Sequence, residues 1–215
     1  MWIWWIALSW ADKPLPDLGP ELARVEWARL DLQLTQGCQL APLLGVVTCQ
    51  DGVVDKVVAR IDAFSRAVVR DAGLEYLAGL AYRYDGRRGR ARRRYEAAVA
   101  LDPTYDAAWY DLGELHLVGG RLDEAEAAFA KVAELVADGE KAWVGPWRLA
   151  EVAASRGDAE AFETHIKAAL QDGFTFRSIA GLPNWKAFYA DPRLRDTFDK
   201  LLTVYATPEV RNSLR

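Results

Sequence analysis

The densest concentration of residues able to bind a ligand is a run of arginines between positions 83 and 94. The run holds seven arginines and one acid, Asp85. Guanidinium groups grip phosphates or carboxylates through paired hydrogen bonds, so such a cluster could bind an anion. Alternatively, the run is a solvated helix surface on which Arg92 pairs with Glu96 one turn later. Six of these residues form what we call the basic edge: Arg87, Arg88, Arg90, Arg92, Arg93 and Arg94.

Few other side chains suit acid–base, nucleophilic or metal chemistry. The sequence has two histidines, His116 and His165, and two cysteines, which are too few for a four-cysteine zinc site or a disulfide scaffold. It also lacks the nucleophile-elbow, zinc-protease and phosphate-cradling glycine motifs. We therefore expect no enzyme, no cofactor and no metal, with His116 in the core and His165 on a solvated helix face.

Composition narrows the class of protein further. The 215 residues are 51% hydrophobic and carry a net charge of −4. A chain this apolar packs a core rather than staying disordered, and a general nucleic-acid binder would usually be basic. The length suits one large domain or an array of repeats.

Glycines recur every 34 residues along the middle of the chain. Two series have this spacing: Gly45, Gly79 and Gly113, and Gly52, Gly86 and Gly120. Apolar residues between them also align, which defines units at 38–71, 72–105 and 106–139, and a fourth at 143–176 after a short insertion. A fixed period of this length indicates stacked supersecondary units.

Each unit is expected to be a pair of antiparallel helices. In the third unit we expect one helix from about Ala107 to Val118 and a second from about Leu122. Gly119 and Gly120 end the first helix, because glycine readily adopts the left-handed conformation found beyond a helix end. The apolar residues of the second helix share one face: Ala125, Phe129 and Val132.

These residues resemble the tetratricopeptide repeat family, whose pattern is an aromatic residue, Leu-Gly, Tyr, Ala, Phe, Ala and Pro at set offsets. The third unit matches at Trp109, Leu112, Gly113, Ala125 and Phe129. The second matches at Gly79, Tyr82, Ala91, Tyr95, Ala98 and Pro103. The resemblance covers about 38–176 and implies an all-α fold, a right-handed α-solenoid of helix–turn–helix repeats.

Both ends of the array resemble caps. Residues 21–34 form a candidate capping helix, and residues 177–204 resemble the closing helices of many bacterial members of the family. The expected organisation is a single solenoid domain over 21–204 with a loose tail at 205–215.

The resemblance also implies a binding surface, because the first helix of each repeat lines the concave groove in this family. Eight residues take those positions: Tyr76, Leu80, Tyr110, Asp111, Glu114, Trp147, Arg148 and Glu151. They suggest a protein–protein interaction module or scaffold that binds a peptide or helix. Alternatively, the aromatic residues at these offsets pack on the neighbouring repeat. The alternative is an anion- or RNA-binding protein that uses the basic edge, although the net charge makes nucleic acid unlikely. The sequence does not indicate the oligomeric state.

The first eleven residues are uncharged and contain four tryptophans. Ser9 and Ala11 fit the small residues of a secretory cleavage site, and residues 12–20 form a proline-rich linker. The segment is too short to span a bilayer as a helix. It is therefore a candidate leader of a periplasmic or secreted protein. The alternatives are an apolar segment packed on the body of a cytoplasmic protein and an anchor at a membrane surface.

Cys38 and Cys49 distinguish two interpretations of the first unit. If both lie on one helix, about 16 Å separates them and they stay free thiols, since a disulfide needs Cα atoms within about 7 Å. Export would favour a disulfide, which requires a loop over 37–50, and Pro42 and Gly45 permit one. The repeat pattern slightly favours the helix.

Overall fold

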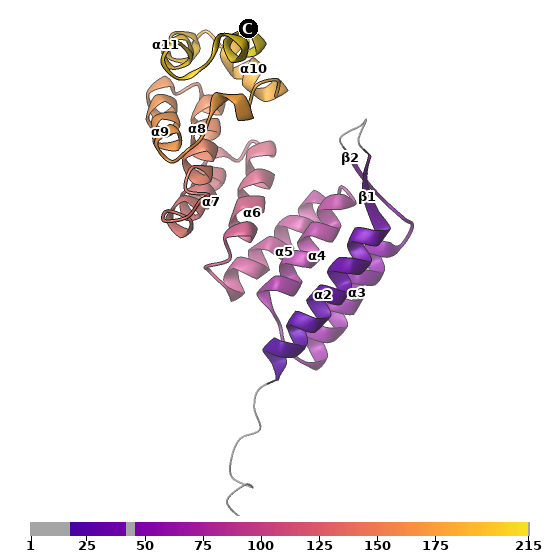
Figure 1. Ribbon diagram of the computed structural model, residues 1–215. Coiled ribbons are helices and arrows are strands. Elements are labelled where there is room, and N and C mark those ends of the chain that lie inside the picture. The colour runs from indigo at the N-terminus through magenta and orange to yellow at the C-terminus, as the bar shows by residue number, and fades with distance from the viewer. Residues whose placement is uncertain (1–17, 42–45, 215) are drawn as a thin grey trace, which may run out of the picture. The chain divides into compact units, whose positions relative to one another are not determined.

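The computed structural model describes residues 18–41 and 46–214, which are mostly helical with one two-stranded sheet (Figure 1). The chain divides into two compact units between Arg87 and Arg88. The sequence predicts one domain over 21–204, whereas this boundary falls inside the second repeat. Each unit is described by itself below. The expected leader at 1–11 and most of the linker lie outside the described residues.

The first unit is built around three helices, α2 (Gly19–Gly37), α3 (Val53–Ala67) and α4 (Ala72–Tyr84). Each of them contacts the other two, and they run side by side in Figure 1. Apolar side chains from all three helices form the core, including Ala23, Leu30, Leu34, Val57, Ile61, Leu74 and Leu77.

Between α2 and α3 the chain forms a β-hairpin rather than a helix. Strand β1 (Cys38–Ala41) pairs antiparallel with β2 (Val46–Cys49), and Cys38 lies opposite Cys49. The two cysteines form a disulfide with their Cα atoms 4.0 Å apart. The helix favoured by the repeat pattern is therefore wrong here. The valines and threonine of Val46–Cys49 prefer strands, so local propensity outweighs the repeat period, and the first helix pair is α2 with α3.

A buried acid joins α2 to α3. Glu26 is 7% exposed and accepts hydrogen bonds from Arg60 of α3 at 2.5 Å and from Arg29 at 3.2 Å. Burial opposes ionisation of Glu26, but the hydrogen bonds from the two arginines outweigh it and lower the pKa of this carboxyl.

The second unit begins with five helices in succession: α5 (Arg88–Leu101), α6 (Asp106–Val118), α7 (Leu122–Leu135), α8 (Val144–Arg156) and α9 (Ala159–Gln171). Each contacts the next along the chain. The helix pairs expected in the third and fourth repeats are confirmed as α6 with α7 and α8 with α9. All three predicted core residues of α7 are buried.

Four glycines adopt the same left-handed conformation just before the second helix of a pair. They are Gly52, Gly86, Gly120 and Gly157, with φ between 70° and 73°. A side chain would strain this backbone conformation, which glycine adopts without cost. The periodic glycines therefore reflect a repeated turn, and the turn persists even where the hairpin replaces the expected helix.

The chain closes with α10 (Pro183–Ala190), α11 (Arg195–Tyr205) and α12 (Pro208–Leu214). The expected cap at 177–204 contains the first two of these helices. The loose tail expected at 205–215 is wrong, because Val210 and Leu214 of α12 are buried in the same core as Trp185 and Phe198. Two apolar side chains one helical turn apart are enough to hold this short helix against the unit.

Candidate functional site

The predicted groove residues of the second unit come from two helices, α6 and α8. Tyr110, Asp111 and Glu114 lie on α6, and three others lie on α8: Trp147, Arg148 and Glu151. Helix α7 packs against both. A Cβ built on Gly145 would lie 2.4 Å from the Cα of Ala133, so glycine lets the start of α8 approach the α7 backbone.

Arg148 is the centre of a charged and aromatic cluster. Its guanidinium pairs with Glu114 of α6 and with Glu151 one turn along α8. The same group lies 4.4 Å from the ring centroid of Trp147 and 4.9 Å from that of Tyr110, within the range of cation–π attraction. Arg148 is only 7% exposed, so two carboxylates and two aromatic faces replace its water.

Glu151 extends this cluster to the C-terminal helices. It is 1% exposed, and its Oε1 accepts hydrogen bonds from Asn184 Nδ2 at 2.9 Å and from Trp185 Nε1 at 2.8 Å. Both donors come from α10. The cluster formed by Tyr110, Glu114, Trp147, Arg148 and Glu151 is therefore fixed from three helices, and we call it the Arg148 cluster.

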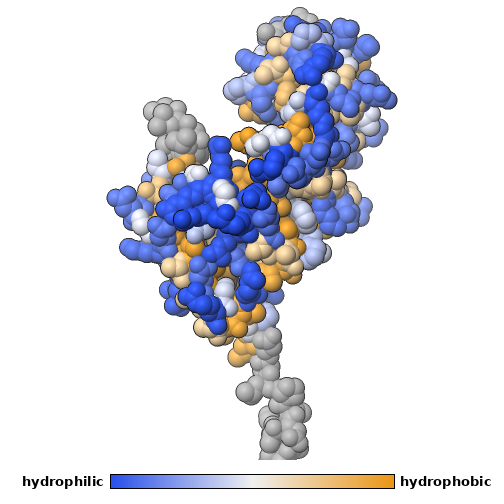
Figure 2. Space-filling view, turned by 180° about the vertical axis from the view of Figure 1, so that it is seen from behind, coloured by the Kyte–Doolittle hydropathy of each residue, from blue (hydrophilic) through white to orange (hydrophobic). Residues whose placement is uncertain are grey.

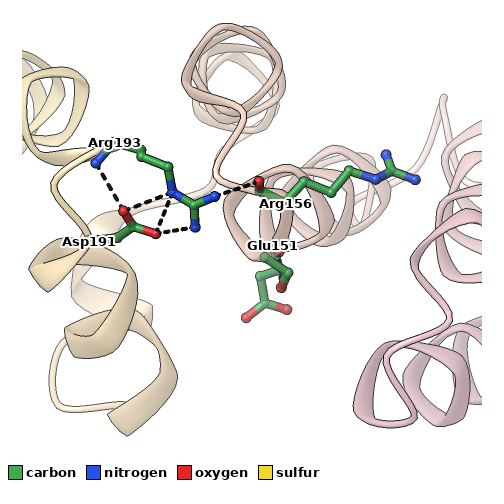
Figure 3. A network of polar contacts seen from close by, with 5 residues as sticks. Glu151, Arg156, Asp191 and Arg193 are labelled. Atoms are coloured by element: carbon green, nitrogen blue, oxygen red, sulfur yellow. Dashed lines mark hydrogen bonds and ion pairs between the residues drawn. The ribbon is translucent and has the colours of Figure 1, made fainter.

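A second polar network lies at the C-terminal end of α8 (Figure 3). Asp191 binds the guanidinium of Arg193 with contacts of 2.6–3.1 Å, and Arg193 Nη1 donates to the Arg156 carbonyl at 3.1 Å. The Arg156 side chain pairs with Asp123 and Glu126 of α7 at 2.6 Å. In Figure 3, Glu151 projects away from the Asp191–Arg193 pair. This network holds the end of α8 and is structural in character.

The structure divides the eight predicted groove residues by exposure. Asp111, Arg148 and Glu151 are buried, whereas Tyr110, Glu114 and Trp147 are half-buried. Trp147 also stacks on Phe174 at 6.2 Å between ring centroids and contacts Trp143 at 5.6 Å. The accessible part of this surface in the second unit is thus Tyr110, Glu114 and Trp147, supported from beneath by buried charges.

The other two predicted groove residues, Tyr76 and Leu80, lie on α4 in the first unit. Both are half-buried. The structure therefore describes them apart from the Arg148 cluster.

Members of the basic edge already have partners within the chain. Arg87 pairs with Asp55 at 2.6 Å and with Asp85, and its hydrogen bond to Asp55 raises the pKa of its guanidinium. Arg92 pairs with Glu96 at 2.5 Å, as the helical spacing predicts. Arg88, Arg90 and Arg93 are exposed and Arg94 is half-buried. The unit boundary falls between Arg87 and Arg88.

The two histidines differ from each other in their surroundings. His116 is 8% exposed, and its Nδ1 accepts a hydrogen bond from Arg121 Nε at 2.8 Å, which confirms the expected core histidine. Burial and the charge of Arg121 lower its pKa. His165 is half-buried rather than solvated as expected, and burial lowers its pKa as well.

Ligand-binding features outside these clusters are few in the described part of the chain. No group of three or more His, Cys, Asp or Glu residues there could hold a metal ion. Open hollows of about 530 and 340 Å³ adjoin Tyr205, and none of the predicted groove residues lines them. Every helix in the described residues is too short or too polar to cross a lipid bilayer.

The sequence did not predict the two donors that bind the Arg148 cluster from α10, Asn184 and Trp185. Both belong to the segment that resembles a closing helix. The indole N–H of a tryptophan and the side-chain amide of an asparagine both donate hydrogen bonds, and such groups need an acceptor when they are buried. The repeat offsets gave no sign that these donors reach Glu151, 33 residues earlier in the chain.

Comparison with known proteins supports the helical repeat architecture. The chain resembles solved TPR-like repeats from a Podosopora anserina protein named for kinesin light chain, at 14% identity and a TM-score of 0.57 over 91% of this chain and 94% of that one. It also resembles MamA at 20% identity and a TM-score of 0.50, over 56% of this chain and 69% of that one. At these identities the likeness shows the fold alone. No curated protein gives a significant match.

These observations define an all-α helical repeat protein. The tetratricopeptide repeat family matches residues 76–140, which include most of α4 and all of α5, α6 and α7. Residues 76–140 therefore match tetratricopeptide repeats, as the glycine period and residue types predict, and the fold of the chain is that of a helical repeat protein. This fold generally serves protein–protein interaction or scaffolding, and such proteins are generally not enzymes.

Proposed function

We propose that the chain is a protein-binding module that holds a peptide or helix against α6 and α8 of the second unit. The observation that carries this proposal is the Arg148 cluster, which supports two half-buried aromatic side chains on a rigid base. Aromatic residues with a wet edge are common energetic centres of protein interfaces. A surface fixed before binding loses little conformational entropy when a partner arrives.

The chemistry of the surface suggests what it would bind. Tyr110 and Trp147 offer apolar faces, and Glu114 offers a carboxylate whose side chain is 22% exposed. No basic side chain of the cluster is free to capture a C-terminal carboxylate, because Arg148 is buried between two acids. We therefore expect the partner to bind through an apolar side chain in the middle of a segment and not through its C-terminal residue.

A displayed library of random peptides, selected against the full chain, tests this proposal. Tyr110→Ala and Trp147→Ala are expected to weaken a selected peptide at least about tenfold, since each removes a central aromatic contact. The matched control is Tyr205→Ala on α11, which removes an aromatic side chain 49% exposed elsewhere. Thermal melting followed by circular dichroism checks that each variant is folded. Equal affinity for the wild type and both cluster variants would overturn the proposal.

Ionic strength separates this function from an anion- or RNA-binding role for the basic edge. Binding through that edge should weaken steeply as salt rises, because phosphate contacts release counterions. Under our proposal, alanine at Arg92, Arg93 and Arg94 leaves peptide binding unchanged. The pairing of Arg87 with Asp55 and of Arg92 with Glu96 supports the protein-binding function over this rival.

We also propose that the protein is periplasmic or secreted. The Cys38–Cys49 disulfide supports this location, because disulfides persist in oxidising compartments and are rare in the cytosol. N-terminal sequencing of the native protein, with mass spectrometry after thiol alkylation, tests it. An N-terminus at or near Asp12 and unalkylated cysteines are expected. An intact Met1 with two alkylated cysteines would indicate a cytoplasmic protein.

A further inference from the structure

Helix α2 carries apolar side chains on the side that faces away from the core of the first unit. Leu18, at the N-cap of α2, and Val25 and Leu32 are spaced seven residues apart and are 56%, 68% and 57% exposed. Leu22, 48% exposed, lies beside them. We call these four residues the outer stripe of α2. Apolar atoms appear in Figure 2 (orange) where the described chain meets the grey N-terminal residues.

The outer stripe lies opposite the buried face of the same helix. At 100° per residue, Leu18, Val25 and Leu32 fall within about 40° of one another. The buried residues Ala23, Leu30 and Leu34 fall on the far side of the helix. Helix α2 therefore carries apolar side chains on two faces, and the exposed Arg29 lies beside those of the outer stripe.

This pattern is unexpected for the first described helix of a repeat array. A terminal element that is to stay in water needs a polar outer face. Apolar residues repeated every seven positions lie on one line along a helix, as the a positions of a coiled coil do, although Glu21 and Ala28 take the intervening d positions here. Exposed apolar side chains scattered singly need no explanation, but four on one stripe of a single helix do.

The sequence of α2 is complementary to itself in one orientation. If two copies cross antiparallel with Val25 opposite Val25, Leu18 faces Leu32 and Leu22 faces Ala28. The same register brings Glu21 opposite Arg29, both of which are exposed, and Arg29 also pairs with Glu26 of its own helix. A parallel pair would instead place Glu21 against Glu21 and Arg29 against Arg29. Like charges at such positions disfavour pairing, so the flanking charges favour the antiparallel arrangement.

We propose that the outer stripe of α2 binds the same stripe of a second copy of this chain, in an antiparallel helix pair with a two-fold axis at Val25. The interface is isologous, as in most homodimers. The proposal is independent of peptide binding, because α2 belongs to the first unit and the Arg148 cluster to the second.

Single cysteines test the register of the pair. The chain's two cysteines are joined in a disulfide, so one added cysteine is the sole free thiol. In the full chain, Val25→Cys is expected to form a covalent dimer under mild oxidation, because the axis places residue 25 opposite itself. Leu18→Cys and Leu32→Cys alone should not cross-link, whereas an equimolar mixture of the two should. Cross-linking of all three variants alone would indicate a parallel pair, and cross-linking of none would indicate that something else covers the stripe. Either result overturns the proposal.

A charge placed in the stripe tests whether it holds the dimer together. Light scattering coupled to size exclusion, over a concentration series of the full chain, should show a dimer for the wild type. Val25→Glu should raise the dimer dissociation constant by at least about tenfold, which corresponds to about 1.4 kcal/mol. The matched control is Val204→Glu, at a valine 71% exposed on α11, which should remain dimeric. A monomeric wild type, or a Val25→Glu variant that dimerises as the wild type does, would overturn the proposal.

Discussion

Arg148 has a full positive charge in the interior of the second unit. Two carboxylates and the faces of Trp147 and Tyr110 surround it, and Glu151 in turn accepts hydrogen bonds from α10. A buried pair of this kind costs desolvation on both sides, and the loss of one member leaves the other without compensation. Its value to the protein is that it holds two aromatic side chains in one geometry.

Removal of the Glu151 carboxylate should therefore be strongly destabilising. We expect Glu151→Ala to lower the free energy of unfolding by about 3–5 kcal/mol, because Arg148 loses one of its two carboxylate partners and the Asn184 and Trp185 donors lose their acceptor. Urea unfolding followed by circular dichroism measures the change. Glu163→Ala, which breaks an exposed pair with Lys167, is the control and should show no resolvable change. Similar losses in the two variants would contradict a special role for the Arg148 cluster.

His116 should make stability depend on pH in a defined direction. Burial and Arg121 hold the pKa of its imidazole below the ordinary value of 6.5. At a pH between the His116 pKa of the folded chain and that of the unfolded chain, the unfolded chain binds the proton and the folded chain does not. The unfolding free energy is therefore highest above pH 6.5 and decreases as the pH falls below 6.5.

Nuclear magnetic resonance titration of the His116 ring measures this pKa directly. Unfolding in urea above and below pH 6.5 gives the effect on stability. His165→Asn serves as the background variant, since burial lowers the pKa of His165 too. A His116 pKa at or above 6.5 would be incompatible with the buried, neutral imidazole.

Helix pairs in the second unit depend on where glycine allows close approach. Gly113 of α6 lies against the ring of Phe129 on α7, and a Cβ built on Gly113 would be 2.6 Å from that ring. Gly113 and Phe129 both match the family pattern, and their contact gives a physical reason for both matches. Packing density in a protein interior leaves no room for an added methyl group at such a contact.

Gly113→Ala should therefore destabilise the second unit despite the better helix propensity of alanine. We expect a loss of about 1–3 kcal/mol from overpacking, measured by thermal or urea unfolding. Gly89→Ala is the matched control. Nothing lies within 4 Å of its added Cβ and its φ is not positive, so it should be neutral or slightly stabilising. A stable Gly113→Ala variant would show that Phe129 can move aside.

At the scale of the whole molecule, the chain consists of two compact units with different features. The first contains the hairpin, the disulfide and the outer stripe of α2, whereas the second contains the Arg148 cluster and the closing helices. The boundary falls within the region that matches the family.

The disulfide should stabilise the first unit selectively. Closing a loop of this length contributes about 3 kcal/mol through the unfolded chain, so we expect Cys38→Ser with Cys49→Ser to lower the stability of that unit by about this amount. Hydrogen exchange should become faster for amides of α2 and α3 and stay unchanged for α8 and α9. The wild type under reducing conditions is the matched comparison. Equal acceleration in every helix would show that the two units unfold as one.

Much of the fold was predictable because its signals are local. The left-handed turn at Gly52, Gly86, Gly120 and Gly157 recurs because glycine alone adopts it without strain, and a one-dimensional sequence displays that requirement as a period. The bounds of α6 and the buried face of α7 followed from capping residues and helical spacing in the same way.

The sequence by itself therefore determined the resemblance of residues 76–140 to tetratricopeptide repeats, the helix pairs of the third and fourth repeats and the turns between helices. Only the tertiary structure decided that Cys38–Ala41 and Val46–Cys49 form paired strands joined by a disulfide and that α12 packs on the core. Tertiary contacts also decided that Asp111, Arg148 and Glu151 are buried while Tyr110, Glu114 and Trp147 stay accessible. The physical reason is that exposure and partner choice depend on residues far away in the chain, such as Trp185 opposite Glu151, and no local spacing encodes those distances.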